Sequence, residues 1–222
     1  SADKGNIIAM SKYGSMLKNG NGVKKDAKLA CTYMKMAADG GFPNAMFNYA
    51  SMVKKGNGVE ANSQEAAKYF KMSADNGIVP GIFKYGCMLK SGDGVEMNKE
   101  EASRYFKIAS YKGDTDSMNN YGVMLLNGEG VEQNKEEACR YFKMSAENGS
   151  KVGMLKYGCM LKDGEGIEKN ETEACQYFKS AIDKGSIDAL NEYGLMLKNG
   201  QGIEKDETEA VRYFKMAADK HQ

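Results

Sequence analysis

The chain has 222 residues, of which 41% are hydrophobic, enough to bury a substantial core. Basic and acidic residues number 31 and 30, so the net charge of +1 gives no field that would favour nucleic acid or an anionic membrane. No apolar run approaches the roughly 20 residues that span a bilayer, and the five cysteines include no CxxC pair that would suggest a zinc site. We expect a water-soluble chain in a reducing, cytoplasmic compartment.

One pattern of 36 residues runs along the chain. A tyrosine recurs at one position, a Gly-x-Gly motif begins seven residues later, and a second tyrosine follows. The first tyrosines are Tyr13, Tyr49, Tyr85, Tyr121, Tyr157 and Tyr193, and the second are Tyr33, Tyr69, Tyr105, Tyr141, Tyr177 and Tyr213. Because the spacing never changes, the sequence predicts six repeats of equal length in one repeat domain, residues 1–222.

In chain order, a short tail precedes the six repeats. The expected repeats are residues 6–41, 42–77, 78–113, 114–149, 150–185 and 186–222. Residues 1–5 are assigned to the tail of a preceding repeat because they align with residues 73–77, where a later helix ends. We therefore expect a fragment of a longer array, in which the lack of a signal peptide says little about the compartment.

Each repeat predicts a first helix (helix A), a tight loop and a second helix (helix B), as the third repeat illustrates. Tyr85 and Leu89 share one helical face, and Gly92 stands where a helix needs a left-handed terminal residue. Asn98 then caps helix B, which ends at Gly113. No strand pattern remains, and one hairpin alone buries too little surface, so an all-α solenoid of stacked hairpins is predicted.

The segment from Tyr85 to Ala109, YGCMLKSGDGVEMNKEEASRYFKIA, resembles the Sel-one-like repeat, a relative of the tetratricopeptide repeat. The resemblance extends over all six repeats, although Tyr-Phe stands where Trp-Tyr is common. It implies a right-handed superhelix that serves as an adaptor in signalling, complex assembly or protein degradation. Some bacterial relatives link helices through two cysteines per repeat, but Ala74 and Gly81 occupy such positions here, so that disulfide subclass is not expected.

Several features that could indicate chemistry are interpreted as structural. The Gly-x-Gly loops lack both the preceding strand of a dinucleotide site and the Gly-Lys-Ser/Thr of a P-loop. The single histidine, His221, stands at the end of the chain without partners for a catalytic triad. The cysteines are expected to act as small hydrophobic residues and most methionines as core filler. We therefore predict no enzyme, no catalytic residue, no cofactor and no metal site.

The resemblance directs the partner site to helix A, which lines the concave face of tetratricopeptide-like solenoids. We expect the site to consist of helix A side chains that point outward. These stand two residues before, two residues after and five residues after the first tyrosine of each repeat. Its members are Phe47, Phe83, Cys87, Val123, Leu155, Cys159, Leu195, Lys54, Lys90 and Lys162. Large apolar residues at the first position are expected anchors, and the lysines a basic rim for an extended acidic or apolar peptide. Alternatively, the lysines are solvated and simply favour the helix dipole.

Three functions remain open from the sequence. The favoured one is a scaffold that binds a protein or peptide in the helix A groove, since the helix B exterior is repetitively charged, as a solvated face would be. The second is a structural spacer or lattice component of a larger assembly. The third, a small-molecule-binding or hydrolytic protein, is disfavoured because histidine and clustered acids are lacking in the groove.

Overall fold

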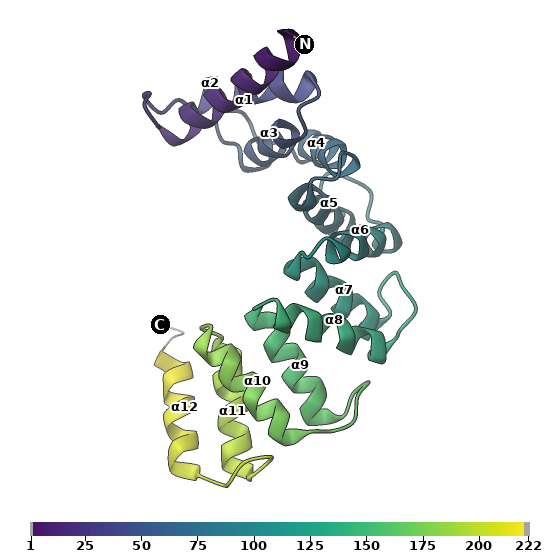
Figure 1. Ribbon diagram of the computed structural model, residues 1–222, viewed down its shortest axis with the longest axis vertical. Helices are drawn as coiled ribbons and strands as arrows, with labels where there is room; N and C mark the ends of the chain where they lie inside the picture. The colour runs from purple at the N-terminus through teal and green to yellow at the C-terminus, as the bar shows by residue number, and fades with distance from the viewer. Residues whose placement is uncertain (1, 220–222) are drawn as a thin grey trace. The chain divides into compact units, whose positions relative to one another are not determined.

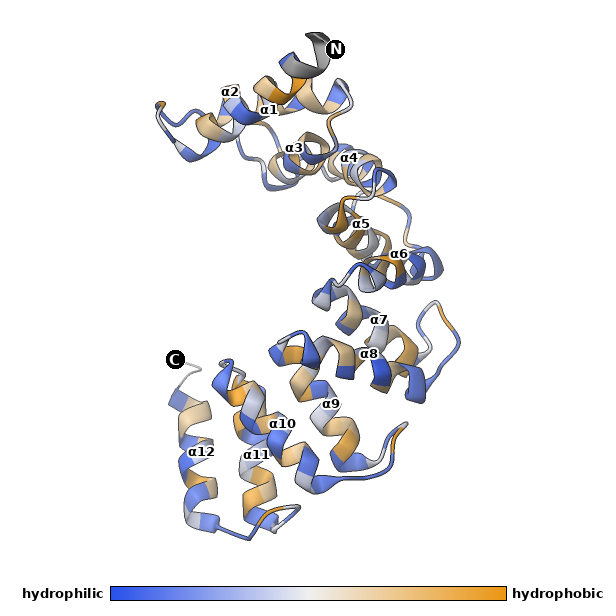
Figure 2. Ribbon diagram, in the orientation of Figure 1, coloured by the Kyte–Doolittle hydropathy of each residue, from blue (hydrophilic) through white to orange (hydrophobic). Residues whose placement is uncertain are grey.

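The computed structural model describes the backbone of residues 2–219 and the side chains of residues 6–219 (Figure 1). In this part of the chain there are twelve α-helices and no strand, which confirms the all-α prediction. Figure 2 shows that each helix carries both hydrophobic and hydrophilic residues, as expected for helices that pack on one side. His221 lies outside the described residues.

The helices divide between two compact units of three hairpins each. Unit 1, residues 1–112, contains α1 (Ala2–Asn19), α2 (Ala27–Asp39), α3 (Pro43–Lys55), α4 (Ser63–Asp75), α5 (Val79–Ser91) and α6 (Lys99–Tyr111). Unit 2, residues 113–222, contains α7 (Thr115–Asn127), α8 (Lys135–Glu147), α9 (Lys151–Asp163), α10 (Glu171–Asp183), α11 (Ile187–Asn199) and α12 (Glu207–Asp219). Odd-numbered helices are helix A and even-numbered helices are helix B. Within each unit, every helix B packs on the helix A before it and, where one follows, on the next helix A.

The first helix differs from the sequence-based expectation. Gly5 was expected to end a helix as Gly77 does, but α1 is continuous from Ala2 to Asn19. A glycine is tolerated inside a helix at a cost of about 1 kcal/mol, and the continuous helix keeps the backbone N–H and C=O groups around Gly5 hydrogen-bonded.

The predicted caps at the start of helix B are confirmed. In unit 1 the side chains of Asp26, Asn62 and Asn98 each accept a hydrogen bond of 2.9 Å from the backbone N–H three residues later. Unit 2 repeats the arrangement at Asn134 and Asn170. Each bond satisfies an N–H that would otherwise lack a partner in the first turn, and this fixes where helix B begins.

The two glycines of the loop in the third repeat have different tasks. Gly92 ends α5 with a φ of 73°, the left-handed cap that the sequence predicts. Gly94, with a φ of 75°, also lies directly against the first residue of the preceding helix B, α4. A Cβ at Gly94 would stand 2.2 Å from the carbonyl oxygen of Ser63, closer than any real contact. The second glycine is therefore a junction between repeats as well as a turn residue.

A pair of tyrosines joins the two helices of every hairpin. The six pairs have ring centroids 4.7–4.9 Å apart in edge-to-face geometry, which adds to the free energy of burial. Deeper in the hairpin, the glycine after the first tyrosine makes room for a buried phenylalanine: a Cβ at Gly158 would come within 2.8 Å of the Phe178 ring. The small residue in helix A is thus matched to a large one in helix B.

The methionines are less buried than expected. Met34, Met52 and Met124 lie in the core, but Met36 and Met144 are 47% and 39% exposed on helix B. The expectation of core filler is wrong at Met36 and Met144, because each lies three residues after the second tyrosine of its hairpin on a part of helix B that no neighbouring helix covers fully. The exterior of helix B therefore carries half-exposed apolar side chains among its charges.

Two tyrosines, the buried Tyr157 and the half-buried Tyr105, predict a loss of stability in alkali. Burial raises the pKa of Tyr105 and of Tyr157 to about 12, from an ordinary value of 10.0. Between these values the unfolded chain releases protons that the folded chain retains, so the stabilisation is present below pH 10 and is lost as the pH rises through about 12. We expect phenolate absorbance and helix loss to rise together over this interval; full ionisation of both tyrosines near pH 10 with the helices intact would contradict this.

Candidate functional site

The candidate site is a groove in unit 1 between the helices α3 and α5, with a volume of about 490 Å³. Its lining includes Phe47 and Ser51 from α3, Phe70 from α4, and Cys87 and Met88 from α5. The Phe47 and Phe70 rings are tilted against one another with centroids 5.7 Å apart. Phe70 and Met88 are only 3% and 4% exposed, whereas Phe47 is half-buried, so an aromatic side chain is left partly open to the groove.

Lysines gather at the edges of this groove. Lys18 extends from α1, Lys54 and Lys55 from the end of α3, and Lys84 from α5. The one carboxylate in the lining, Asp93, is ion-paired with Lys54, and Lys54 also donates a hydrogen bond of 2.9 Å to the Ser63 hydroxyl. The hydrogen bond from Lys54 lowers the pKa of the Asp93 carboxyl. Lys54 is therefore held by the neighbouring loop and is not a mobile rim cation.

Among the polar groups of the groove, one amide stands out. The hydroxyls of Ser51 and Ser91 donate to the backbone carbonyls of Phe47 and Cys87, at 2.9 Å and 3.0 Å, so their donors are occupied. The Asn48 carboxamide lines the groove and has no hydrogen bond within the described residues. An amide carries two donors and an acceptor, which suits it to the backbone of a bound chain.

The structure brings together only some of the predicted site residues. Phe47, Lys54 and Cys87 line the groove. Phe83 does not; its ring is tilted against Phe106 at 5.9 Å, and the Lys84 ammonium lies 5.2 Å from its centre. Lys90 is half-buried at the end of α5 and is also outside the groove lining.

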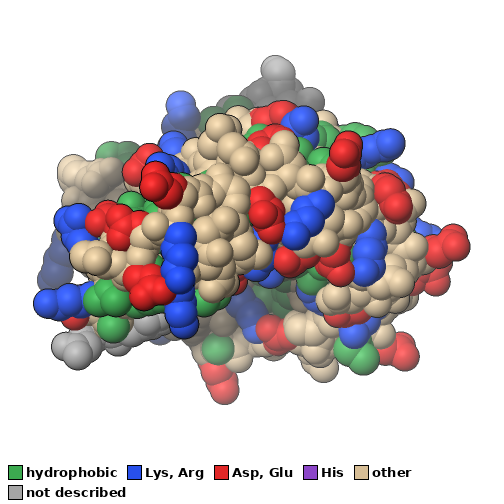
Figure 3. Space-filling model, turned by 90° about the horizontal axis from the view of Figure 1, so that it is seen from below, with side chains coloured by type: hydrophobic (Ala, Val, Ile, Leu, Met, Phe, Trp, Pro, Cys, Tyr) green, Lys and Arg blue, Asp and Glu red, His purple; other side chains and the backbone are tan. Residues whose placement is uncertain are grey.

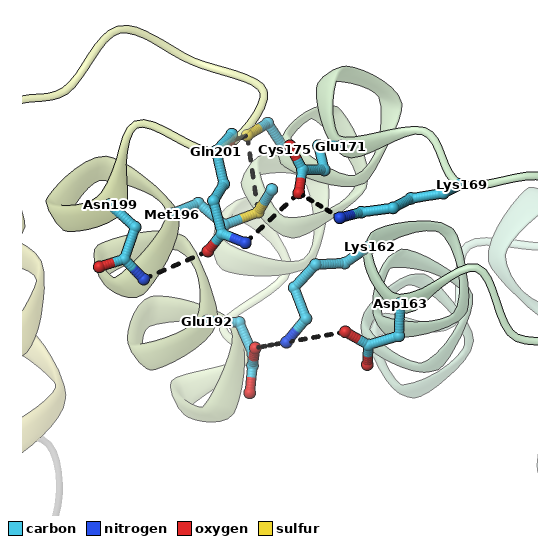
Figure 4. A network of polar contacts seen from close by, with 9 residues as sticks. All are labelled: Lys162, Asp163, Lys169, Glu171, Cys175, Glu192, Met196, Asn199 and Gln201. Atoms are coloured by element: carbon cyan, nitrogen blue, oxygen red, sulfur yellow. Dashed lines mark hydrogen bonds and ion pairs between the residues drawn. The ribbon is translucent and has the colours of Figure 1, made fainter.

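In unit 2 the corresponding lysine is neutralised by its surroundings. Figure 4 shows Lys162 of α9 between Glu192 of α11, at 2.7 Å, and Asp163, at 3.7 Å. Burial lowers the pKa of Lys162, but the hydrogen bond to Glu192 and the nearby charges of Glu192 and Asp163 together outweigh this, and the net shift is upward. Lys162, predicted as part of a basic rim, is thus engaged in an ion pair with the next repeat.

The other predicted site residues of unit 2 are Val123 on α7, Leu155 and Cys159 on α9, and Leu195 on α11. Val123 and Leu155 are half-buried, and Leu195 is 42% exposed. Burial raises the pKa of the Cys159 thiol to about 11, which disfavours the reactive thiolate at neutral pH.

A second network in Figure 4 joins the loop after α11 to the start of α10. Gln201, the middle residue of its Gly-x-Gly motif, donates to Glu171 at 3.3 Å, and Lys169 pairs with the same carboxylate at 2.8 Å. The Cys175 thiol contacts the Met196 sulfur at 3.6 Å. These contacts link neighbouring repeats, and the polar groups that make them are occupied by one another.

Sequence reasoning selected only Phe47, Lys54 and Cys87 among the residues that line the groove; those it missed include Lys18, Lys55, Asn48 and Lys84. Asn48, Ser51 and Lys55 follow one another at helical spacing, so the face next to the predicted one could have been included. Asp93 had no such signal, because its approach to Lys54 depends on how two repeats stack.

The described residues contain no group of three or more histidines, cysteines or acids placed to hold a metal ion. Within the same residues, no helix is both long and apolar enough to cross a membrane. The five cysteines are present as thiols rather than disulfides. Acidic and basic side chains are interspersed over the face in Figure 3, so no single-sign surface is seen there.

Hairpins of fixed length, each joined internally by a tyrosine pair and stacked through glycine junctions, define an α-helical solenoid repeat protein. Six copies of the Sel1 repeat match residues 7–42, 43–78, 79–114, 115–150, 152–186 and 187–221, and the chain therefore belongs to the Sel1 repeat family. Proteins of this family are in general protein-interaction scaffolds rather than enzymes.

Solved structures agree with this assignment. A protective antigen of uropathogenic Escherichia coli with the same fold is 29% identical over 99% of this chain and 47% of its own, with a TM-score of 0.92. A Sel1 repeat protein from Oxalobacter formigenes is 28% identical over 97% of this chain and 86% of its own, with a TM-score of 0.85. This chain thus spans about half the length of the E. coli antigen. No curated protein matches the sequence.

Proposed function

We propose that the chain is a non-enzymatic scaffold that binds a segment of a protein partner in the groove of unit 1. The observation that carries this proposal is Phe47, an aromatic ring left half-buried beside a groove of about 490 Å³. Other repeats place Ser11, Asn119 or Asn191 at the same position, so the hairpin fold does not require a large apolar side chain there. Half-buried aromatic residues of this kind are typical anchors for partners.

The helix A positions of unit 2 belong to the same proposal as additional contacts. Leu195 is exposed, and Val123, Leu155 and Cys159 are half-buried, so all four could be covered further by a partner. The ion-paired Lys162 is the weakest of the predicted contacts, because a partner would first have to compete with Glu192.

The test is selection of binding peptides from a random dodecapeptide phage library. Selected peptides are then measured against the wild type, the groove variant Phe47→Ala and the outer-face variant Met36→Ser. Met36 is a fair control because it is also an exposed apolar residue of unit 1. We expect Phe47→Ala to weaken binding roughly 10-fold or more while Met36→Ser binds like the wild type.

Circular dichroism and melting of each variant control for folding, since Phe47 also packs on Phe70. If Met36→Ser loses binding while a folded Phe47→Ala retains it, the site lies on the helix B exterior and the groove proposal is wrong. If no peptide is selected above background, the spacer interpretation replaces the scaffold.

A further inference from the structure

The charges around the groove of unit 1 are unbalanced. Four lining residues are lysines and one, Asp93, is a carboxylate. Asp93 is already paired with Lys54, and within the described residues Lys18, Lys55 and Lys84 form no ion pair. The lining thus has an excess of three positive charges around an apolar floor, a combination that attracts anionic groups.

The charge at the position of Lys84 differs from repeat to repeat, so the balance does not follow from the repeat itself. The residue of α11 that corresponds to Asn48 and Lys84 is Glu192, and it neutralises Lys162. Lys162 is the counterpart of Lys54, so each unit holds one lysine of this helix A position in an ion pair with the next repeat. In unit 1 the pairing with Asp93 leaves Lys18, Lys55 and Lys84 without an ion pair among the described residues.

The positions of the cations define how a partner would lie. Lys18 comes from α1 and Lys84 from α5, while Phe47 comes from α3, the helix A of the repeat between them. In an extended chain, successive side chains point in opposite directions. An apolar side chain directed at Phe47 would therefore have neighbours on both sides that point toward the edges, where the lysines are.

We propose, as an extension of the proposed function, that the groove selects an extended segment in which an apolar residue is flanked by acidic residues. The apolar side chain packs on Phe47 and the sulfur and carbon atoms of Met88 and Cys87. The carboxylates pair with Lys18 and Lys84, and the Asn48 amide bonds to the backbone of the segment. Lys54 remains paired with Asp93 and holds the adjacent loop in place.

The same dodecapeptide library tests the acidic preference. The measured quantity is now the amino-acid composition of the selected peptides. One selection uses the wild type, a second uses the charge-reversed double variant Lys18→Glu with Lys84→Glu, and a third uses Arg104→Glu as a charge-reversal control on the helix B exterior. Among the described residues Arg104 pairs only with Glu100 of its own helix, at 2.5 Å, and both side chains are exposed. We expect wild type and control to enrich peptides with Asp or Glu next to a large apolar residue.

The affinity of a selected acidic peptide should fall at least about 10-fold in the double variant, and it should weaken with rising salt for the wild type. Enrichment of neutral or basic peptides that still depend on Phe47 would overturn the acidic preference and leave the scaffold proposal standing. Peptides whose binding ignores both Phe47→Ala and the charge reversal would overturn both proposals.

Discussion

Gly94→Ala should destabilise the chain by about 3 to 4 kcal/mol, far more than the same substitution at Gly77. Both glycines have a left-handed backbone, with φ of 75° and 78°, which costs an alanine about 1 kcal/mol. At Gly77 the new methyl group meets nothing within 4 Å, whereas at Gly94 it would stand 2.2 Å from the Ser63 carbonyl oxygen. Backbone cannot rotate away as a side chain can, so the two repeats would have to separate.

Urea unfolding of the two variants, followed by circular dichroism, measures the difference directly. Gly77→Ala isolates the cost of the backbone conformation, and the remainder at Gly94 is the cost of the lost junction. Equal unfolding midpoints for the two variants would show that the second glycine serves only the turn.

Phe142→Ala should cost about 3 to 5 kcal/mol, because the ring is fully buried and its removal leaves a cavity. Phe142 packs toward Gly122, where a Cβ would come within 2.8 Å of the ring, so the adjacent helix has no side chain to fill the space. Met144→Ala on the same helix is the control: Met144 is 39% exposed, and we expect a loss of about 1 kcal/mol or less.

Thermal unfolding of both variants gives the comparison. A loss at Met144 as large as that at Phe142 would mean that the exterior of α8 is covered in solution. That outcome would also make the helix B exterior a candidate interface.

The sequence predicted the hairpins because their signals are local. Asn98 caps α6 through a backbone N–H three residues away, and Gly92 ends α5 through its own φ. The groove depended on longer distances: Lys54 meets Asp93, 39 residues later, and Lys162 meets Glu192, 30 residues later. No periodic pattern encodes these pairs, since the partner changes from repeat to repeat. The basic rim was therefore predicted at lysines of which two are neutralised.

The exposure of Met36 and Met144 shows a second limit. A methionine that recurs at helical spacing fits a core position and a half-covered exterior position equally well, and only the neighbouring helix decides between them. The match between the glycine after the first tyrosine and a phenylalanine of helix B, as at Gly158 and Phe178, likewise required the structure.

The contact of the second loop glycine with the preceding helix B limits how this protein can change during evolution. Gly94 touches Ser63, and Gly166 and Gly202 touch Lys135 and Glu171 in the same way. A single inserted or deleted residue in the loop would misplace this contact and damage two hairpins together. Duplication or loss of a complete 36-residue repeat would preserve every junction. New binding specificities are therefore expected to arise by exchange of outward side chains or of whole repeats, and not by changes in loop length.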